Sequence, residues 1–394
     1  MFKSAVGLSK KKDPFLAGQE AARRCLAELG EQEPDICLLF SSAMFANLKM
    51  LAGIRSIIPH SPLFGVSDAG EITSEGSYQR SVVMAAIKSD SLSFAAHLEE
   101  DIEVDPRQKG RRIGERVNRR LPKKGKSSEV LIIFSDGLSG SITDVIRGAQ
   151  EILGTSYPIL GGGAGDNFLF QKTYQYYNDR IFSQSVLGLL IQAPKIGFGI
   201  RHGWRPLGRP YKVTRARRNV VWELDGESAI EVYQRYFGPQ IRNLERKYLL
   251  KMVINYPLGM SIPGEKEYLV RNVLDMQLDG SLVFSSDIPE GREVRLMMSN
   301  KELVIAAARD AAWQAGERMS SGEIGLGIIF NSASRYKLLG KERDKEIEEI
   351  KKVLTKIPLI GFYGYSQQAP LSGELNLGQS YSHNQSVVVL VLGE

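Results

Sequence analysis

Three glycine-supported loops carry the polar residues best placed for chemistry. Gly65-Val-Ser-Asp-Ala-Gly-Glu71 aligns with Gly361-Phe-Tyr-Gly-Tyr-Ser-Gln367 without a gap, and Gly161-Gly-Gly-Ala-Gly-Asp166 aligns with both after one deletion. Their last residues, two acids and an amide, then occupy equivalent positions. Because glycine lets backbone N–H groups approach a ligand closely, this arrangement indicates a site that hydrogen-bonds a polar ligand. The alternative is that the glycines only make tight turns and the acids cap exposed N–H groups.

Each loop belongs to a short unit that recurs three times in the chain. A strand-like run ends in phenylalanine and two small polar residues at 38–42, 132–136 and 328–332. A proline, two apolar residues and a glycine follow at 62–65, 158–161 and 358–361. Another apolar strand begins after each loop, near residues 82, 186 and 387. The pattern predicts strand, helix, short strand, glycine-rich loop and strand, which is a βαββ unit.

The βαββ units predict both the fold class and the place of a site. A helix that joins two strands of one sheet makes those strands parallel, with their carboxyl ends at one edge. We therefore expect the polar strand ends and the glycine loops to meet in a crevice at that edge, where α/β sheets generally bind ligands. The expected fold is α/β, with repeated βαββ units forming mixed sheets flanked by helices in two closely packed pseudo-symmetric domains.

The length of 394 residues favours two domains, because single hydrophobic cores rarely grow so large. The stretch between the second and third units differs from them, with hairpin signals at 224–226 and 278–280 and a helix predicted over 228–237. Asn300 is typical of the N-cap of a further helix that ends near Gly316. We place the boundary after residue 226, which gives domains 1–226 and 227–394. One continuous body and two hinged lobes both fit the repeat pattern.

Composition narrows the class of protein. The longest apolar runs are strand-length and fall far short of the roughly 20 residues that a membrane span needs. The start of the chain has its basic residues after a short apolar patch, the reverse of a secretory signal. Cys25 and Cys37 are typical of buried thiols in a reducing compartment. We expect a cytoplasmic protein that does not insert into a membrane.

The net charge of +6 is concentrated in one segment. Ten basic residues and one acid lie between Arg107 and Lys126, and Ile113, Val117 and Leu121 recur there at helical spacing. This spacing indicates an amphipathic helix with a solvated basic face. A contact with a polyanion such as nucleic acid is the alternative.

Other kinds of chemistry find little support in the sequence. The chain has four histidines and two cysteines without metal-ligand spacing. The glycines at 161–165 lack the Lys-Ser/Thr ending of a P-loop. We therefore assign no catalytic residue, no metal and no cofactor. His383 and Asn384, at the entry to the last strand, bind a ligand in one interpretation and satisfy a turn in the other.

Several segments carry motifs in a shared order. They are residues 64–72, 161–166, 202–208 and 223–226 in the first half, and 269–271, 289–291, Arg335, 361–363, 369–370 and 383–385 in the second. Together they resemble the FIST domain family, whose N-terminal and C-terminal parts occur together in bacterial signalling proteins. Two positions depart from the family pattern: Ser332 stands where cysteine is usual, and Ser366-Gln367 replaces Gly-Glu. Gln367 therefore has no charge to offer a cationic ligand.

The resemblance implies a sensory protein in which residues 1–226 are the FIST N-terminal domain and 227–394 the C-terminal domain. Such a protein binds a small molecule, an amino acid being one candidate, and acts through a separate signalling protein. In that site Arg335 would meet a carboxylate, with Glu71 or Asp166 near an amine. The expected ligand-binding residues are Ser67, Gly70, Glu71, Asp136, Gly162, Gly163, Asp166, Asn167, Arg335, Tyr363, Gln367, His383 and Asn384.

Two other functions stay open beside the sensor. An enzyme would use Glu71 or Asp166 as a general base on a small polar metabolite in the same crevice, and turnover would distinguish it from a sensor. A scaffold without a ligand would bind its partner through the basic segment 107–126, where charge reversal should abolish partner capture. Of the three, we favour a sensor that does not catalyse a reaction.

Overall fold

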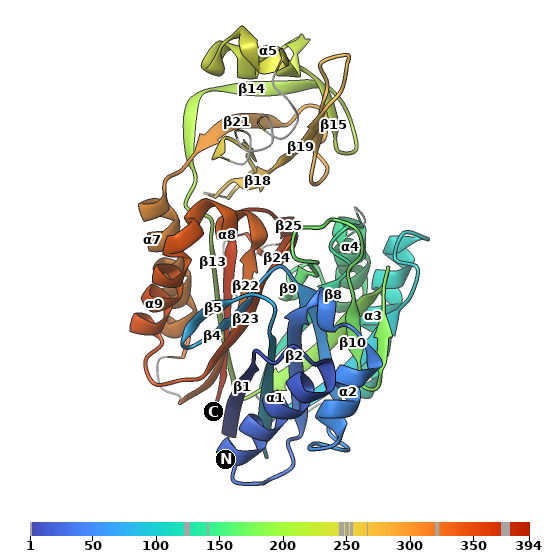
Figure 1. Ribbon diagram of the computed structural model, residues 1–394. Helices are drawn as coiled ribbons and strands as arrows, with labels where there is room; N and C mark the ends of the chain where they lie inside the picture. Colours follow the sequence, from blue (N-terminus) through green and yellow to red (C-terminus); the bar gives the residue numbers. More distant parts are fainter. Residues whose placement is uncertain are drawn as a thin grey trace.

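The protein consists of three similar α/β units and a smaller β-rich insert (Figure 1). The computed structural model describes residues 2–394 except 122–126, 140–141, 244–247, 249–251, 253–254, 266, 320–322 and 372–378. No helix in this described part is both long and apolar enough to cross a membrane. The predicted α/β class, with mixed sheets flanked by helices, is confirmed.

The three units share one order of elements. The first contains β1 (Phe2–Ser9), α1 (Pro14–Glu28), β2 (Ile36–Ser42), η1 (Ala43–Phe45), α2 (Leu48–Arg55), β3 (Leu63–Asp68), β4 (Glu71–Thr73), β5 (Gly76–Tyr78) and β6 (Val82–Ser89). The second contains β7 (Ser93–Glu99), α3 (Pro106–Arg120), β8 (Ser128–Ser135), α4 (Ile142–Leu153), β9 (Ile159–Gly163), β10 (Gln175–Tyr177), β11 (Arg180–Phe182) and β12 (Val186–Ala193). The third contains β13 (Lys195–Arg201), α7 (Lys301–Glu317), β22 (Ile324–Ser332), α8 (Ala333–Leu339), η3 (Gly340–Glu342), α9 (Arg343–Val353), β23 (Leu359–Gly364), β24 (Ser366–Pro370), β25 (Ser380–His383) and β26 (Val387–Gly393).

The insert interrupts the third unit between β13 and α7. It contains β14 (Arg205–Arg217), β15 (Val220–Leu224), β16 (Glu227–Ser228), α5 (Ala229–Phe237), η2 (Pro239–Asn243), β17 (Leu258–Met260), β18 (Leu269–Arg271), β19 (Val273–Met276), β20 (Leu282–Phe284) and β21 (Glu293–Met298). Its strands form a sheet of their own around a separate apolar core. Figure 1 shows the insert beyond α8 and β25 of the third unit.

The three units build three six-stranded sheets with equivalent strand orders, β1-β6-β2-β3-β10-β11, β7-β12-β8-β9-β24-β25 and β13-β26-β22-β23-β4-β5. The crossover strands pair in parallel in each sheet, β2 with β3, β8 with β9 and β22 with β23, as predicted. The short hairpins are exchanged in a cycle. The hairpin of the first unit completes the third sheet, that of the second completes the first, and that of the third completes the second. The three units therefore form one continuous body.

A ring of backbone hydrogen bonds closes this body where the short parallel strands end. The Ala69 N–H donates to the Tyr363 carbonyl at 2.9 Å, the Tyr365 N–H to the Gly163 carbonyl at 3.0 Å, and the Gly165 N–H to the Ser67 carbonyl at 2.9 Å. Each bond joins one unit to the next. The strand ends of the three units consequently meet around a common pseudo-threefold axis.

The repeated phenylalanines of the sequence pattern meet inside the body. The ring centroids of Phe40 and Phe134 lie 5.8 Å apart and those of Phe134 and Phe330 6.2 Å apart, and Phe362 contacts all three. They belong to a core shared by the inner faces of the three sheets. Separate apolar clusters on the outer faces hold α1 and α2, α3 and α4, and α7 with α9. This core fixes the sheets, and so the loops that follow them.

Polar caps set where several helices begin. Asp13 accepts a hydrogen bond from the Leu16 N–H at 2.9 Å and is followed by proline, and Asp105 accepts one from the Gln108 N–H at 3.2 Å and is also followed by proline. Asn300 accepts from the Leu303 N–H at 2.8 Å. The predicted N-cap of α7 is therefore confirmed.

The predicted domain boundary falls inside the insert. Residues 226 and 227 lie at the turn between β15 and β16, which pair with each other. The strand β13, before this point, pairs with β26 at the end of the chain. The boundary between two domains after residue 226 stays a prediction.

The glycine that begins each predicted loop allows the close parallel pairing. Gly65 lies opposite Leu39, and a Cβ atom at Gly65 would overlap the Leu39 carbonyl oxygen. We expect Gly65→Ala to lower the free energy of unfolding by about 3 kcal/mol, because backbone must move to admit the methyl group. Gly316→Ala is the control, since the nearest atom, Leu354 Cδ2, is 3.6 Å away and a helical alanine stabilises by up to about 1 kcal/mol. Equal stability of the two variants in urea unfolding would contradict this account.

Candidate functional site

Two carboxyl groups are buried together where β3 ends and β4 begins. Asp68 and Glu71 are both inaccessible to solvent. Glu71 accepts hydrogen bonds from the Ser81 hydroxyl at 2.7 Å and from the Ser81 N–H at 3.4 Å. The polar groups that act on the Asp68 carboxyl group are the Glu71 carboxyl group and the Gly70 N–H. Two carboxyl groups buried close together repel each other when both are ionised, so this environment favours at least one proton on the pair.

The surroundings raise the pKa values of both carboxyl groups. Burial raises the pKa of Asp68 well above its ordinary value, and the charge of Glu71 raises it further. Burial also raises the pKa of Glu71, to about 7, while hydrogen bonds from Ser81 and Asp68 act in the opposite direction. Both shifts favour the protonated forms, and the pKa of Glu71 lies near neutrality.

Strand register shows which residues are equivalent to Glu71 in the other units. Glu71 lies opposite Phe362, Gln367 lies opposite Gly162, and Gln175 lies opposite Val66. The third equivalent is thus Gln175, and the predicted equivalence of Asp166 is wrong. The physical reason is a longer connection in the second unit, where residues 164–174 separate β9 from β10 and shift the hairpin along the sequence.

The acid pair occurs in one unit of the three. Where Glu71 stands, the other units have Gln175 and Gln367, and where Asp68 stands they have Ala164 and Gly364. Gln175 accepts a hydrogen bond from the Ser185 hydroxyl at 2.7 Å, the same contact that Glu71 makes with Ser81. A neutral amide therefore fulfils the structural role. The fold does not require the two acids, which makes them the strongest candidates for a function.

Residues 164–174, here called the cap loop, pack against the strand end that carries Asp68. The Asn167 N–H donates to the Asp68 carbonyl at 3.1 Å, and the Asn167 side chain accepts from the Ser42 hydroxyl. Asn167, Phe168 and Phe170 have φ values of 57°, 66° and 54°, in the left-handed region that costs free energy for residues other than glycine. The loop is therefore held in a strained conformation by its surroundings.

Asp166 is the residue that holds the cap loop in shape. Its carboxylate accepts from the N–H groups of Phe170, Gln171 and Lys172 at 2.9, 2.6 and 3.0 Å, and from the Tyr365 hydroxyl at 2.5 Å. The ring of Phe170 also stacks on Tyr365, with centroids 4.7 Å apart. The Asp166 oxygens are consequently used inside the protein.

A polar hollow of about 330 Å³ lies beside the cap loop, at the carboxyl end of β8. Asp136 and Thr173 form its buried floor. The Asp136 carboxylate accepts from the N–H groups at 138, 139 and 184 at 2.9, 3.0 and 3.2 Å, and from the Thr173 hydroxyl at 2.7 Å. Lys172 and Glu103 are both exposed and place one positive and one negative charge at the rim. Lys172 belongs to the cap loop, so the loop forms one wall of the hollow.

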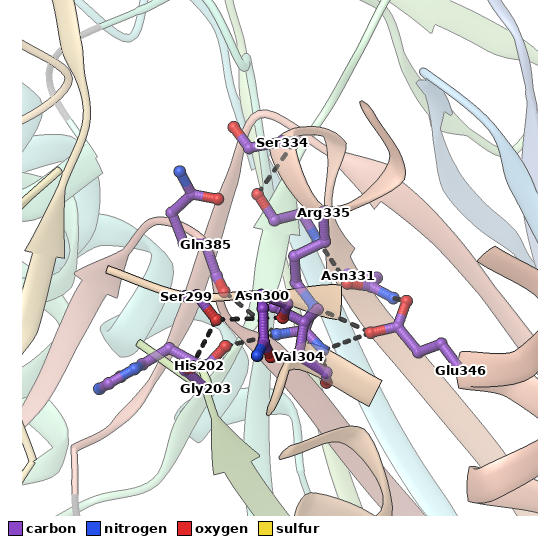
Figure 2. Close-up of polar contacts among 11 residues, drawn as sticks. His202, Gly203, Ser299, Asn300, Val304, Asn331, Ser334, Arg335, Glu346 and Gln385 are labelled. Atoms are coloured by element: carbon purple, nitrogen blue, oxygen red, sulfur yellow. Dashed lines mark hydrogen bonds and ion pairs between the residues drawn. The ribbon is translucent and has the colours of Figure 1, made fainter. Parts of the chain in front are cut away.

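Arg335 lies outside this area, in a buried network at the start of α8 (Figure 2). Its Nε and Nη2 donate to the Glu346 carboxylate, the Nε contact at 2.8 Å. Nη1 donates to the carbonyls of His202 at 2.7 Å and Gln385 at 3.3 Å, and Nη2 donates to that of Val304 at 2.7 Å. All five N–H groups are thus used within the protein. None is left for the carboxylate of a ligand.

His383 and Asn384 lie where the insert meets the body. The His383 Nε2 atom contacts the Ala369 carbonyl at 2.9 Å, and burial lowers the pKa of the ring to about 3, so the histidine is neutral. Asn384 accepts from the Ser285 hydroxyl of the insert at 2.5 Å. In this structure both side chains serve contacts within the protein.

The remaining predicted residues support the loops. Ser67 donates to the Gly165 carbonyl at 2.7 Å, Gln367 donates to the Asn331 carbonyl at 3.1 Å, and Tyr363 packs on Tyr336 with ring centroids 5.0 Å apart. Gly162 and Gly163 pair with β24, and Gly70 leaves room for the two tyrosine rings. The structure thus gathers Ser67, Glu71, Asp166 and Asn167 around the cap loop and Asp136 beside it, while Arg335, His383 and Asn384 lie elsewhere.

Sequence reasoning missed Asp68, Gln175 and the charged rim of the hollow. Asp68 stands in the first glycine loop, and its signal was available, because its counterparts in the other loops, Ala164 and Gly364, are not acidic. The residues around Gln175 do not indicate that it is the counterpart of Glu71, because this relation depends on the register of the strands. Lys172 and Glu103 come from two separate loops that only the fold brings together.

The predicted basic segment forms α3 and is partly neutralised. Ile113 and Val117 are buried on one face, so the amphipathic helix is confirmed. On the other face two arginines, at 107 and 111, pair with Glu151, and Lys109 and Arg112 lie near Glu99. The lysines at 123, 124 and 126 are outside the described residues. A scaffold surface on this segment stays a prediction.

The chain matches the FIST N domain over residues 5–227 and the FIST C domain over residues 229–370. It belongs to this family, as the motifs predicted. FIST domains are small-ligand-sensing domains of signal-transduction proteins.

Similar proteins occur in Methanocaldococcus jannaschii and Mycobacterium tuberculosis. It is 24% identical over 322 residues to the uncharacterized protein MJ1623 of Methanocaldococcus jannaschii, covering 76% of this chain but 61% of that protein. It is 22% identical over 384 residues to the uncharacterized protein Rv0628c of Mycobacterium tuberculosis, covering 93% of this chain and 95% of that protein. A solved cyanuric acid hydrolase from A. caulinodans overlaps 48% of this chain and 71% of its own, with 9% identity and a TM-score of 0.28, too low for any argument.

Proposed function

We propose that this protein senses a small polar ligand in the hollow beside the cap loop and acts through a separate signalling protein. The observation that carries this proposal is the position of the cap loop. Residues Gln171 to Thr173 wall the hollow, and Asn167 of the same loop bonds to the strand end at Asp68. A ligand that favours one conformation of this strained loop would shift its population, which is what a sensor requires.

We further propose an amino acid as the ligand class. The rim of the hollow offers an ammonium group on Lys172 and a carboxylate on Glu103, which suit the carboxylate and the amine of a zwitterion. The polar residues Thr173, Ser183 and Gln184 also line the hollow. A hollow of about 330 Å³ is at the lower end of the volumes that bind small molecules.

The test is a thermal-shift screen against amino acids, nucleotides and small organic acids, followed by calorimetry of each hit. A ligand at 100 times its dissociation constant should stabilise the protein by about 2.7 kcal/mol. We expect Lys172→Ala and Glu103→Gln each to weaken binding of the hit about tenfold or more, because each removes a charge-assisted hydrogen bond. Lys49→Ala, an exposed lysine in α2, is the matched control. Unchanged affinity in both rim variants would rule out the hollow as the site.

An enzymatic function is a second candidate, favoured by one observation. The pKa of Glu71, raised to about 7, suits a general base at neutral pH. Glu71 is inaccessible to solvent, so a substrate would reach it only after the packing around it opened. Product analysis of every thermal-shift hit separates the two functions, because a sensor returns its ligand unchanged whereas an enzyme consumes it.

A further inference from the structure

The cap loop and the buried acids are joined through β3. Ser67 holds both ends of the loop, since its hydroxyl donates to the Gly165 carbonyl at 2.7 Å and accepts from the Tyr174 N–H at 2.9 Å. The next residue is Asp68, whose carbonyl accepts from Asn167 in the middle of the loop. The strand end that carries Asp68 therefore supplies several anchors of the loop, beside the contacts that the loop makes with Tyr365 and Asp136.

Among the described residues no lysine, arginine or histidine forms an ion pair with Asp68 or Glu71. The titratable groups that face the pair from neighbouring elements are Tyr176 of β10 and Tyr336 of α8, both neutral at physiological pH. A proton lost from the pair leaves a buried charge that Ser81 stabilises by hydrogen bonds but that no cation balances. Water adds to its solvation only if the packing around the pair loosens.

We propose that Asp68 and Glu71 form a proton-operated switch that keeps the cap loop closed while the pair is fully protonated and loosens it when a proton leaves. The second and third units have no acid pair, which indicates that packing of the fold alone does not require one. They place Gln175 and Gln367 at the same register with no acid at the position of Asp68. The switch acts on the loop itself and does not depend on what the hollow binds.

The direction of the pH effect follows from the acidities. In the closed state the pKa of Glu71 lies at about 7, above the ordinary value of 4.5 that it would approach when the loop opens. The closed state therefore binds the proton more tightly than the open state. The closed loop is fully favoured below pH about 4.5, and this preference is lost as the pH rises through 7. The raised pKa of Asp68 acts in the same direction.

Hydrogen exchange of the cap-loop amides tests the switch. The N–H groups of Asn167, Phe170 and Lys172 are hydrogen-bonded in the closed loop and should exchange slowly. After correction for intrinsic exchange, we expect their protection to fall about tenfold or more between pH 5 and pH 7.5. Infrared spectra over the same range should show loss of a protonated carboxyl signal that Glu71→Gln removes.

The decisive comparison uses Asp68→Ala/Glu71→Gln, which gives the first unit the residues of the second. Its loop protection should not change with pH. Asp166→Asn, which weakens the bonds inside the loop, should instead loosen it at every pH. If the double variant does not fold, Glu71→Gln alone serves, because glutamine occupies this register in both other units. A wild-type loop whose protection is independent of pH, or a variant that keeps the wild-type dependence, would overturn the proposal.

Discussion

Arg335→Ala is expected to lower the free energy of unfolding by about 3–5 kcal/mol. The substitution leaves Glu346 as a buried carboxylate without its cation. It also removes the donors from the carbonyls of His202, Val304 and Gln385, and each unsatisfied buried group adds to the cost. Urea unfolding at constant pH, followed by circular dichroism, measures the loss.

Two further variants separate the buried charge from general damage. Lys345→Ala removes an exposed partner of Glu342, 3.0 Å away in the neighbouring turn, and should change stability by less than about 1 kcal/mol. Arg335→Met/Glu346→Leu removes both charges and should recover most of the loss, because no unpaired ion stays buried. A loss below about 1 kcal/mol in Arg335→Ala would show that the network of Figure 2 is not what holds these elements.

A substitution at Arg335 would affect ligand binding through the structure of the protein. Arg335 joins the end of β13, the start of α7 and the entry to β26, three elements far apart in the sequence. A variant at this position that failed to bind a ligand would report the loss of those contacts. Lys172 and Glu103 are exposed at the rim of the hollow, so their variants report the site itself.

The fold was predictable where the pattern is local and repeated. A phenylalanine followed by two small polar residues marks each central strand, and the structure places Phe40, Phe134 and Phe330 in one core. The helix between each strand and the glycine at 65, 161 or 361 is long enough for a parallel crossover, and all three crossovers form. Asn300 marked its helix because an N-cap depends on neighbouring residues alone.

What was not predictable depends on contacts between distant strands. No local feature of β4, β10 or β24 says that each hairpin completes the sheet of another unit. The same exchange sets the register that makes Gln175 the counterpart of Glu71, which an alignment with one deletion could not find. An arginine at position 335 suggested a clamp for a ligand carboxylate. Its role instead depends on five hydrogen bonds to four residues from separate segments of the chain.

The acid pair should also give the whole protein an unusual dependence of stability on pH. Glu71 has a pKa of about 7 in the folded protein against 4.5 ordinarily. Its contribution is complete below pH about 4.5 and is lost as the pH rises through 7, by an amount on the order of 3 kcal/mol. Paired surface carboxylates such as Glu151 and Glu342, whose pKa values are lowered, act in the opposite direction.

Glu71→Gln isolates the contribution of the pair from this background. Its stability relative to wild type should increase by about 3 kcal/mol between pH 4.5 and pH 8, measured by urea unfolding at each pH. Gln175→Glu is the mirror variant, since it places a buried acid at the same register in the second unit and should lose stability over that range. A constant difference between wild type and Glu71→Gln at all pH values would mean that Glu71 does not titrate in the folded protein. Because the two amide units already show that the fold tolerates a neutral residue here, such a result could not be attributed to a damaged structure.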